Sequence, residues 1–278
     1  MKKFKNPWPG MALLGGYCAF CLRQLQQASG FESDTGLAVP GSPWGILLPA
    51  FLAAAALLFL LRGRSAPAGI TEMASLRAAF PAQGAPILAY AGGLLWLASA
   101  ALTLMKSRTP VVSDDGYEIL YDGALSAGDL LSAALAALAG VCVLCVLGHP
   151  RQEGRRAEPN SLLLLAAITA LVIRLVLCFR ELSRDPSLQR YYLPLLAMTV
   201  LCLALYLASG FAFGAGRSRR FLPAAAWGTV LCLAAAADPL GLGYRCFFLG
   251  GGAFLLELLR LHRPAEAAPA RSTGEAEA

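Results

Sequence analysis

Long apolar runs recur along nearly the whole chain, and each is long enough to cross a lipid bilayer. A helix of about 20 apolar residues spans the hydrocarbon core of a membrane, and the sequence contains about eight such runs. Only helices and closed barrels span a bilayer, and barrel strands alternate polar and apolar residues, which these runs do not. We therefore expect an all-α integral membrane protein, a polytopic bundle of about eight transmembrane helices.

The runs also predict where each helix lies. The expected helices cover Trp8–Gln27, Trp44–Leu61, Pro86–Met105, Leu125–Gly148, Ser161–Phe179, Tyr191–Phe213, Phe221–Ala237 and Leu240–Leu261. The seventh, of about 17 residues, is at the short end of the spanning range, so whether it spans decides the side of the C-terminus. Residues 1–263 are expected to form one transmembrane domain. Residues 264–278, rich in Ala, Glu and Pro, are expected to form a disordered cytoplasmic tail.

The first run begins after a basic segment, as a signal peptide does, but Arg23 follows its apolar stretch and residues 26–30 form a poor small-residue cleavage site. We expect it to remain as the first helix. The connections between the runs are short, so no soluble catalytic domain is expected.

Basic residues predict how the bundle is oriented, because loops on the cytoplasmic side are enriched in Lys and Arg. With the N-terminus inside, fifteen basic residues fall on the inner side and five on the outer side. The inner ones are Lys2, Lys3, Lys5, Arg62, Arg64, Arg77, Arg151, Arg155, Arg156, Arg217, Arg219, Arg220, Arg260, Arg263 and Arg271; the outer ones are Lys106, Arg108, Arg180, Arg184 and Arg190. This asymmetry predicts both termini in the cytoplasm, and a bacterial cytoplasmic (inner) membrane as the location.

Three arginines lie inside the predicted helices, where an ionised group costs roughly 2.5 to 3.5 kcal/mol and is a candidate functional residue. All three are expected in the outer half of the membrane, near amides and acids on the same side. We expect them to form one outward-facing ligand-binding pocket in which arginine meets an anionic ligand or pairs with Asp185 or Asp238. Its candidate residues are Arg23, Gln27, Arg174, Glu181, Asp185, Asp238 and Arg245. The alternative is that the arginines extend to lipid phosphate and the acids are ordinary loop residues.

The sequence predicts no metal or cofactor. Two Cys-x-x-Cys pairs, Cys18/Cys21 and Cys142/Cys145, are offset by roughly 10 Å along the membrane normal, so they cannot share one metal and are expected to act as small apolar residues. Nucleotide-binding loops and the common hydrolase motifs are absent. Basic residues are divided among short loops rather than gathered in a patch, which excludes nucleic acid as a partner.

These features favour a protein that binds or transports a small solute or lipid through the outward-facing pocket and is not an enzyme. The expected partners are the bilayer, a small anionic solute or lipid head group, and other membrane subunits. Two alternatives stay open. One is a membrane-embedded enzyme acting on a lipid-linked substrate, with Asp185 and Asp238 as acid/base groups. The other is an accessory or scaffold subunit held by small residues; Gly92–Gly93, Gly250–Gly252 and the series Ser132, Ala136 and Gly140 indicate close helix contacts.

Overall fold

The computed structural model describes residues 6–32, 37–64, 79–80, 86–106, 111–112, 118–119, 127–148, 158–182 and 188–262. Its helices are α1 (Trp8–Ser29), α2 (Trp44–Arg64), α4 (Ile87–Lys106), α5 (Ala127–Gly148), α6 (Glu158–Leu182), α7 (Leu188–Ala212), α8 (Ser218–Ala235) and α9 (Leu242–Leu261). Each of the eight predicted helices is found. The short strands β1 (Val111–Val112) and β2 (Glu118–Ile119) pair antiparallel between α4 and α5.

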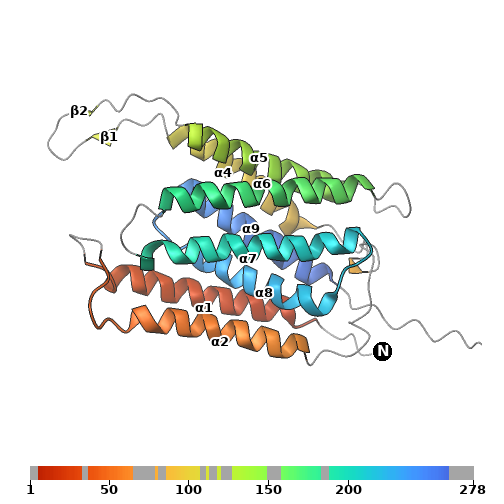
Figure 1. Cartoon of the computed structure of the whole chain (residues 1–278). Coiled ribbons are helices and arrows are strands. Elements are labelled where there is room, and N and C mark those ends of the chain that lie inside the picture. The colour runs from red at the N-terminus through yellow and green to blue at the C-terminus, as the bar shows by residue number, and fades with distance from the viewer. Residues whose placement is uncertain are drawn as a thin grey trace, which may run out of the picture.

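The helices lie side by side and successive helices run in opposite directions (Figure 1). One end of the bundle carries β1 and β2, and we call it the hairpin end. At the other end, the terminal end, α1 begins and α9 finishes. The Asn6 side chain joins these two points, because its Nδ2 donates to the backbone oxygen of Leu259 at 2.7 Å and to that of His262 at 3.4 Å. The start of α1 and the finish of α9 therefore lie on one side of the bundle.

Among the described residues, six helices are long and apolar enough to cross a membrane: α2, α4, α5, α6, α7 and α9. The chain is therefore a multi-pass membrane protein. The other two, α1 and α8, are less apolar but run alongside the six. Helix α8 packs against α1, α2, α7 and α9, and most of its residues are buried. Because α8 is surrounded by these four helices, it belongs to the bundle although it is short and has Arg219 and Arg220 in its first turn.

The outer surface of the bundle is apolar, as contact with lipid requires. Helix α2 shows this most clearly, because Leu48, Leu52, Phe59 and Gly63 are its only buried residues. Ile46, on its opposite face, is 76% exposed. A continuous surface of this kind is rare on proteins that live in water.

Glycines bring neighbouring helices close together. A Cβ on Gly140 of α5 would lie 3.0 Å from the backbone oxygen of Gly93 in α4, and one on Gly93 would lie 2.7 Å from the Leu144 side chain. The backbones can approach this closely because neither residue has a side chain. The interpretation of these glycines as packing positions is confirmed.

An aromatic cluster closes the terminal end around His262, which is 1% exposed. The rings of Phe80, Phe211 and Phe221 surround the imidazole, with centroids 5.5 to 6.0 Å from it. Its Nε2 lies 2.9 Å from the hydroxyl of Ser218 at the start of α8. Burial lowers the pKa of His262 to about 4, so the imidazole is neutral at physiological pH.

Candidate functional site

A buried ion pair joins two distant parts of the chain at the hairpin end. Nε of Arg23, in α1, donates to Oδ1 of Asp238 at 2.5 Å, and both side chains are fully buried. Asp238 lies in the connection between α8 and α9, directly before Pro239. Two charges removed from solvent are tolerated only when each meets the other in good geometry.

Amide side chains of α1 complete this cluster. Gln26 Oε1 accepts from Nη1 of Arg23 at 2.6 Å, and Gln27 Nε2 donates to Oδ1 of Asp238 at 3.0 Å. Gln24 Nε2 donates to the backbone oxygen of Ala237 at 3.5 Å. Gln26 and Gln27 are three and four residues beyond Arg23, a spacing that keeps them on one side of the helix. The last turns of α1 are therefore polar because they hold the α8–α9 connection.

The second carboxylate oxygen of Asp238 has a different hydrogen-bonding environment from the first. Among the residues that the structure describes, Oδ2 is buried and has no hydrogen-bond partner, and the same is true of the Tyr192 hydroxyl. Tyr192, on α7, interacts electrostatically with both Arg23 and Asp238. Burial raises the pKa of Asp238 from 3.8 to about 6, and Arg23 and Gln27 limit this rise.

Arg245 is the fourth of the predicted pocket residues that lie at this cluster, after Arg23, Gln27 and Asp238. Its Nε donates to the backbone oxygen of Asp238 at 3.4 Å, while most of its side chain is exposed. The structure thus brings together Arg23, Gln27, Asp238 and Arg245 from α1, the α8–α9 connection and α9. Asp185 and the side chain of Glu181 lie outside the described residues.

Arg174 of α6 occupies a separate place. Its Nη1 donates to the backbone oxygen of Ser132 in α5 at 2.9 Å. Its guanidinium carbon lies 4.2 Å from the ring centroid of Phe247 and 5.7 Å from that of Tyr244, both on α9. At 1% exposure the side chain does not extend to lipid phosphate. Arg174 therefore binds three helices together through a carbonyl and two aromatic faces.

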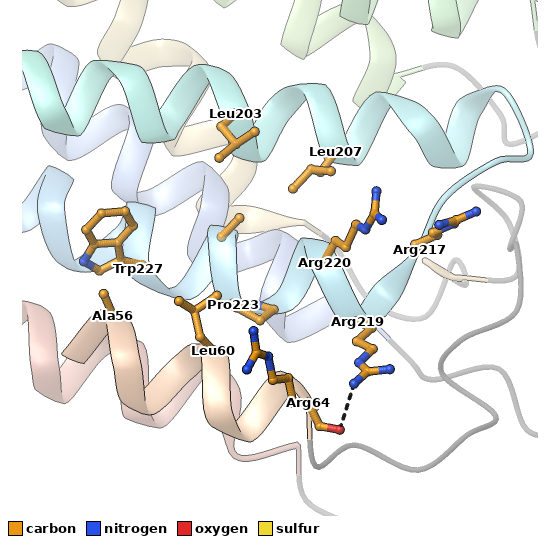
Figure 2. A pocket seen from close by; sticks show the side chains of 11 residues that line it. Ala56, Leu60, Arg64, Leu203, Leu207, Arg217, Arg219, Arg220, Pro223 and Trp227 are labelled. Carbon is orange, nitrogen blue, oxygen red and sulfur yellow. Dashed lines mark hydrogen bonds between the residues drawn. The ribbon is translucent and has the colours of Figure 1, made fainter. Parts of the chain in front are cut away.

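A groove lies at the terminal end, far from this cluster. Figure 2 shows its floor formed by α8 and its walls by α2 and α7. It encloses about 740 Å³. Its apolar part is lined by Ala56, Leu60, Leu203, Leu207, Pro223, Ala224 and Trp227. Its basic mouth is lined by Arg64, Arg217, Arg219 and Arg220. We call this site the arginine groove.

A glycine and an arginine set the shape of the arginine groove. A Cβ on Gly63 would lie 2.5 Å from Cγ of Pro223, so α2 packs this closely on α8 only because residue 63 has no side chain. Arg219 Nη2 donates to the backbone oxygen of Arg64 at 3.4 Å and caps the last turn of α2. All four arginines are exposed, so their guanidinium groups are available at the mouth.

Sequence reasoning did not find the arginine groove, because its arginines were used only to orient the bundle. A signal was present: Arg217, Arg219 and Arg220 lie within four residues at the start of a helix. Which apolar faces flank that helix start was not readable from the sequence.

The remaining features offer less chemistry. A second cavity, of about 380 Å³, is formed by residues 38–43 of the α1–α2 connection with Gly45 and Ile46 of α2, and has no charged lining residue. Within the described ranges, no group of three or more His, Cys, Asp or Glu side chains is placed to hold a metal ion. All eight cysteines lie within the described ranges, and none of them forms a disulfide bond.

No protein family, curated protein or solved structure matches this chain. The features of this chain that bear on its function are therefore the Arg23–Asp238 cluster and the arginine groove.

Proposed function

We propose that this membrane protein binds an anionic phospholipid in the arginine groove. The observation that carries the proposal is one cavity that is apolar along its length and has four arginines at its mouth. A phospholipid has the same division, with acyl chains joined to a phosphate. The volume lies within the usual range for small-molecule sites.

The mouth matches a phosphate group in charge and in hydrogen bonding. Guanidinium groups bind phosphate by paired hydrogen bonds that a lysine ammonium cannot form. Arg64 comes from α2, whereas Arg217, Arg219 and Arg220 come from the start of α8, so a phosphate between them is reached from two sides (Figure 2). The charge count predicts that this end faces the cytoplasm, where anionic lipids are concentrated.

The walls favour a lipid over a water-soluble solute. Leu60 of α2 and Leu203 of α7 line the arginine groove and are 55% and 48% exposed. They belong to the apolar surface that contacts the bilayer, so an acyl chain reaches the groove sideways from the membrane. A solute from water gains nothing from this path.

The hairpin end supports the predicted outward-facing solute site less well. Arg23 and Asp238 bind each other there and are closed off from solvent. An acid/base role for Asp238 toward a lipid-linked substrate also needs an accessible carboxyl group.

Lipid-induced quenching of Trp227 tests the proposal. The purified protein would be titrated in neutral detergent with phosphatidylglycerol or phosphatidylcholine carrying brominated chains. Subtracting the signal of a Trp227→Phe variant isolates this tryptophan. We expect phosphatidylglycerol to quench at lower concentration, and free inorganic phosphate not to displace it, because the acyl chain contributes to binding.

Two double variants separate the arginine groove from general charge effects. Arg64→Gln with Arg220→Gln removes two mouth charges and should weaken phosphatidylglycerol binding about tenfold, or about 1.4 kcal/mol. Arg62→Gln with Arg180→Gln removes two exposed arginines that do not line the groove. Equal quenching by the two lipids in the parent, or equal losses in the two double variants, would contradict the proposal.

A further inference from the structure

The Arg23–Asp238 cluster contains a feature that lipid binding does not use. Oδ2 of Asp238 and the hydroxyl of Tyr192 are both buried, and neither has a hydrogen-bond partner among the described residues. Folded proteins rarely leave such groups unsatisfied, and the exceptions often have a functional reason. Here two of them share one charged environment.

The two carboxylate oxygens of Asp238 differ in the hydrogen bonds that they accept. Oδ1 accepts from Arg23 and from Gln27, whereas Oδ2 receives no donor from the described part of the chain. Burying an ionised oxygen without a donor costs more free energy than burying a neutral hydroxyl without a partner, and protonation at Oδ2 makes this oxygen neutral. The environment of Oδ2 therefore fits the neutral acid better than the anion.

Charged and titratable groups approach Asp238 from three helices. Arg23 of α1 and Arg245 of α9 are cations and oppose protonation, while Tyr192 of α7 contributes a phenol hydroxyl. Arg245 is exposed and reaches only the backbone oxygen, so solvent screens its effect on the carboxyl. Full burial of the carboxyl favours protonation, because the neutral acid is less costly to bury than the anion.

We propose that Oδ2 of Asp238 is a proton-binding site, formed by burial of this oxygen away from every donor of the described residues, and that the cluster gains one positive charge when the site is filled. Burial raises the pKa of Asp238 to about 6, which agrees with this placement. The site is at the opposite end of the bundle from the arginine groove and does not depend on lipid binding (Figure 1).

Infrared difference spectroscopy of the purified full chain tests the site directly. Lowering the pH from about 8 to about 5 should produce the carbonyl stretching band of a buried protonated carboxyl, with a midpoint near pH 6. Asp238→Asn should remove this band. Glu32→Gln, which neutralises an exposed acid at the same end of the bundle, should keep it.

A second variant keeps the test informative where Asp238→Asn does not fold. Gln27→Leu removes one of the two donors to Oδ1 and should raise the midpoint pH of the band, because this hydrogen bond favours the ionised carboxylate. A parent protein with no carboxyl titrating between about pH 5 and pH 7 would overturn the proposal. So would a band that persists in Asp238→Asn, or a midpoint that Gln27→Leu leaves unmoved or lowers.

Discussion

Gly92 of α4 and Gly250 of α9 face each other so closely that a Cβ on either residue would clash with the carbonyl oxygen of the other. A Cβ on Gly92 would lie 2.7 Å from the oxygen of Gly250, and one on Gly250 would lie 2.8 Å from the oxygen of Gly92. The obstacle on both sides is backbone, which a rotamer change cannot move. Contact between α4 and α9 therefore requires glycine at both positions.

The first prediction follows from this contact. Gly250→Ala should lower the free energy of unfolding by about 1 to 3 kcal/mol, because α4 and α9 must separate to admit one methyl group. Gly10→Ala is the matched control, since a Cβ there has no neighbour within 4 Å. Thermal melts of the detergent-solubilised variants measure the difference. Equal destabilisation by the two changes would contradict the assigned contact.

The second prediction concerns acid stability and Asp238. Its pKa in the folded state is raised to about 6, so the folded protein binds this proton more readily than the unfolded chain does. The contribution of Asp238 to stability therefore grows as pH falls from about 6 to about 4, by up to roughly 3 kcal/mol. Asp238→Asn should lose this gain and melt at a lower temperature in acid than at neutral pH. A parent and an Asp238→Asn variant whose melting temperatures change equally between neutral pH and acid would contradict this contribution.

The third prediction concerns His262, whose contribution to stability changes with pH in the opposite direction to that of Asp238. Its pKa is lowered to about 4 in the folded state, so below the ordinary value of 6.5 the unfolded chain takes up the proton first. Stability from His262 is therefore present above about pH 6.5 and is lost as pH falls toward 4. In the parent protein this loss and the gain from Asp238 should largely cancel. Melting curves of His262→Gln at several pH values should show stability rising in acid, and a parallel fall in both proteins would refute the assignment.

The fourth prediction concerns Arg174. Lysine keeps the charge over the Phe247 ring but cannot donate to Ser132 in the same geometry, so Arg174→Lys should cost about 1 to 2 kcal/mol. Neutralising Asp238 should not rescue it, because the Asp238 carboxylate bonds with Arg23 and Gln27. A double-mutant cycle between Arg174→Met and Phe247→Leu measures the ring contact. Strict additivity in that cycle would mean that the contact contributes nothing.

The helices could be predicted from the sequence because a bilayer demands runs of apolar residues whatever their neighbours are. Even α8, the shortest, was found this way. The partner of each buried charge could not be predicted. Arg23 and Arg174 look alike as single arginines in apolar helices, yet one meets an acid and the other meets aromatic rings. That difference depends on which helices are adjacent, and hydropathy does not contain this information.

The ion pair at the hairpin end also has a consequence for synthesis of the protein. Arg23 and Asp238 are 215 residues apart, so α1 enters the membrane long before its counter-ion exists. At about 5 to 20 residues per second, the delay is roughly 10 to 40 seconds. During that interval α1 carries Arg23 without Asp238, and its final contact with the rest of the bundle waits for translation of the α8–α9 connection.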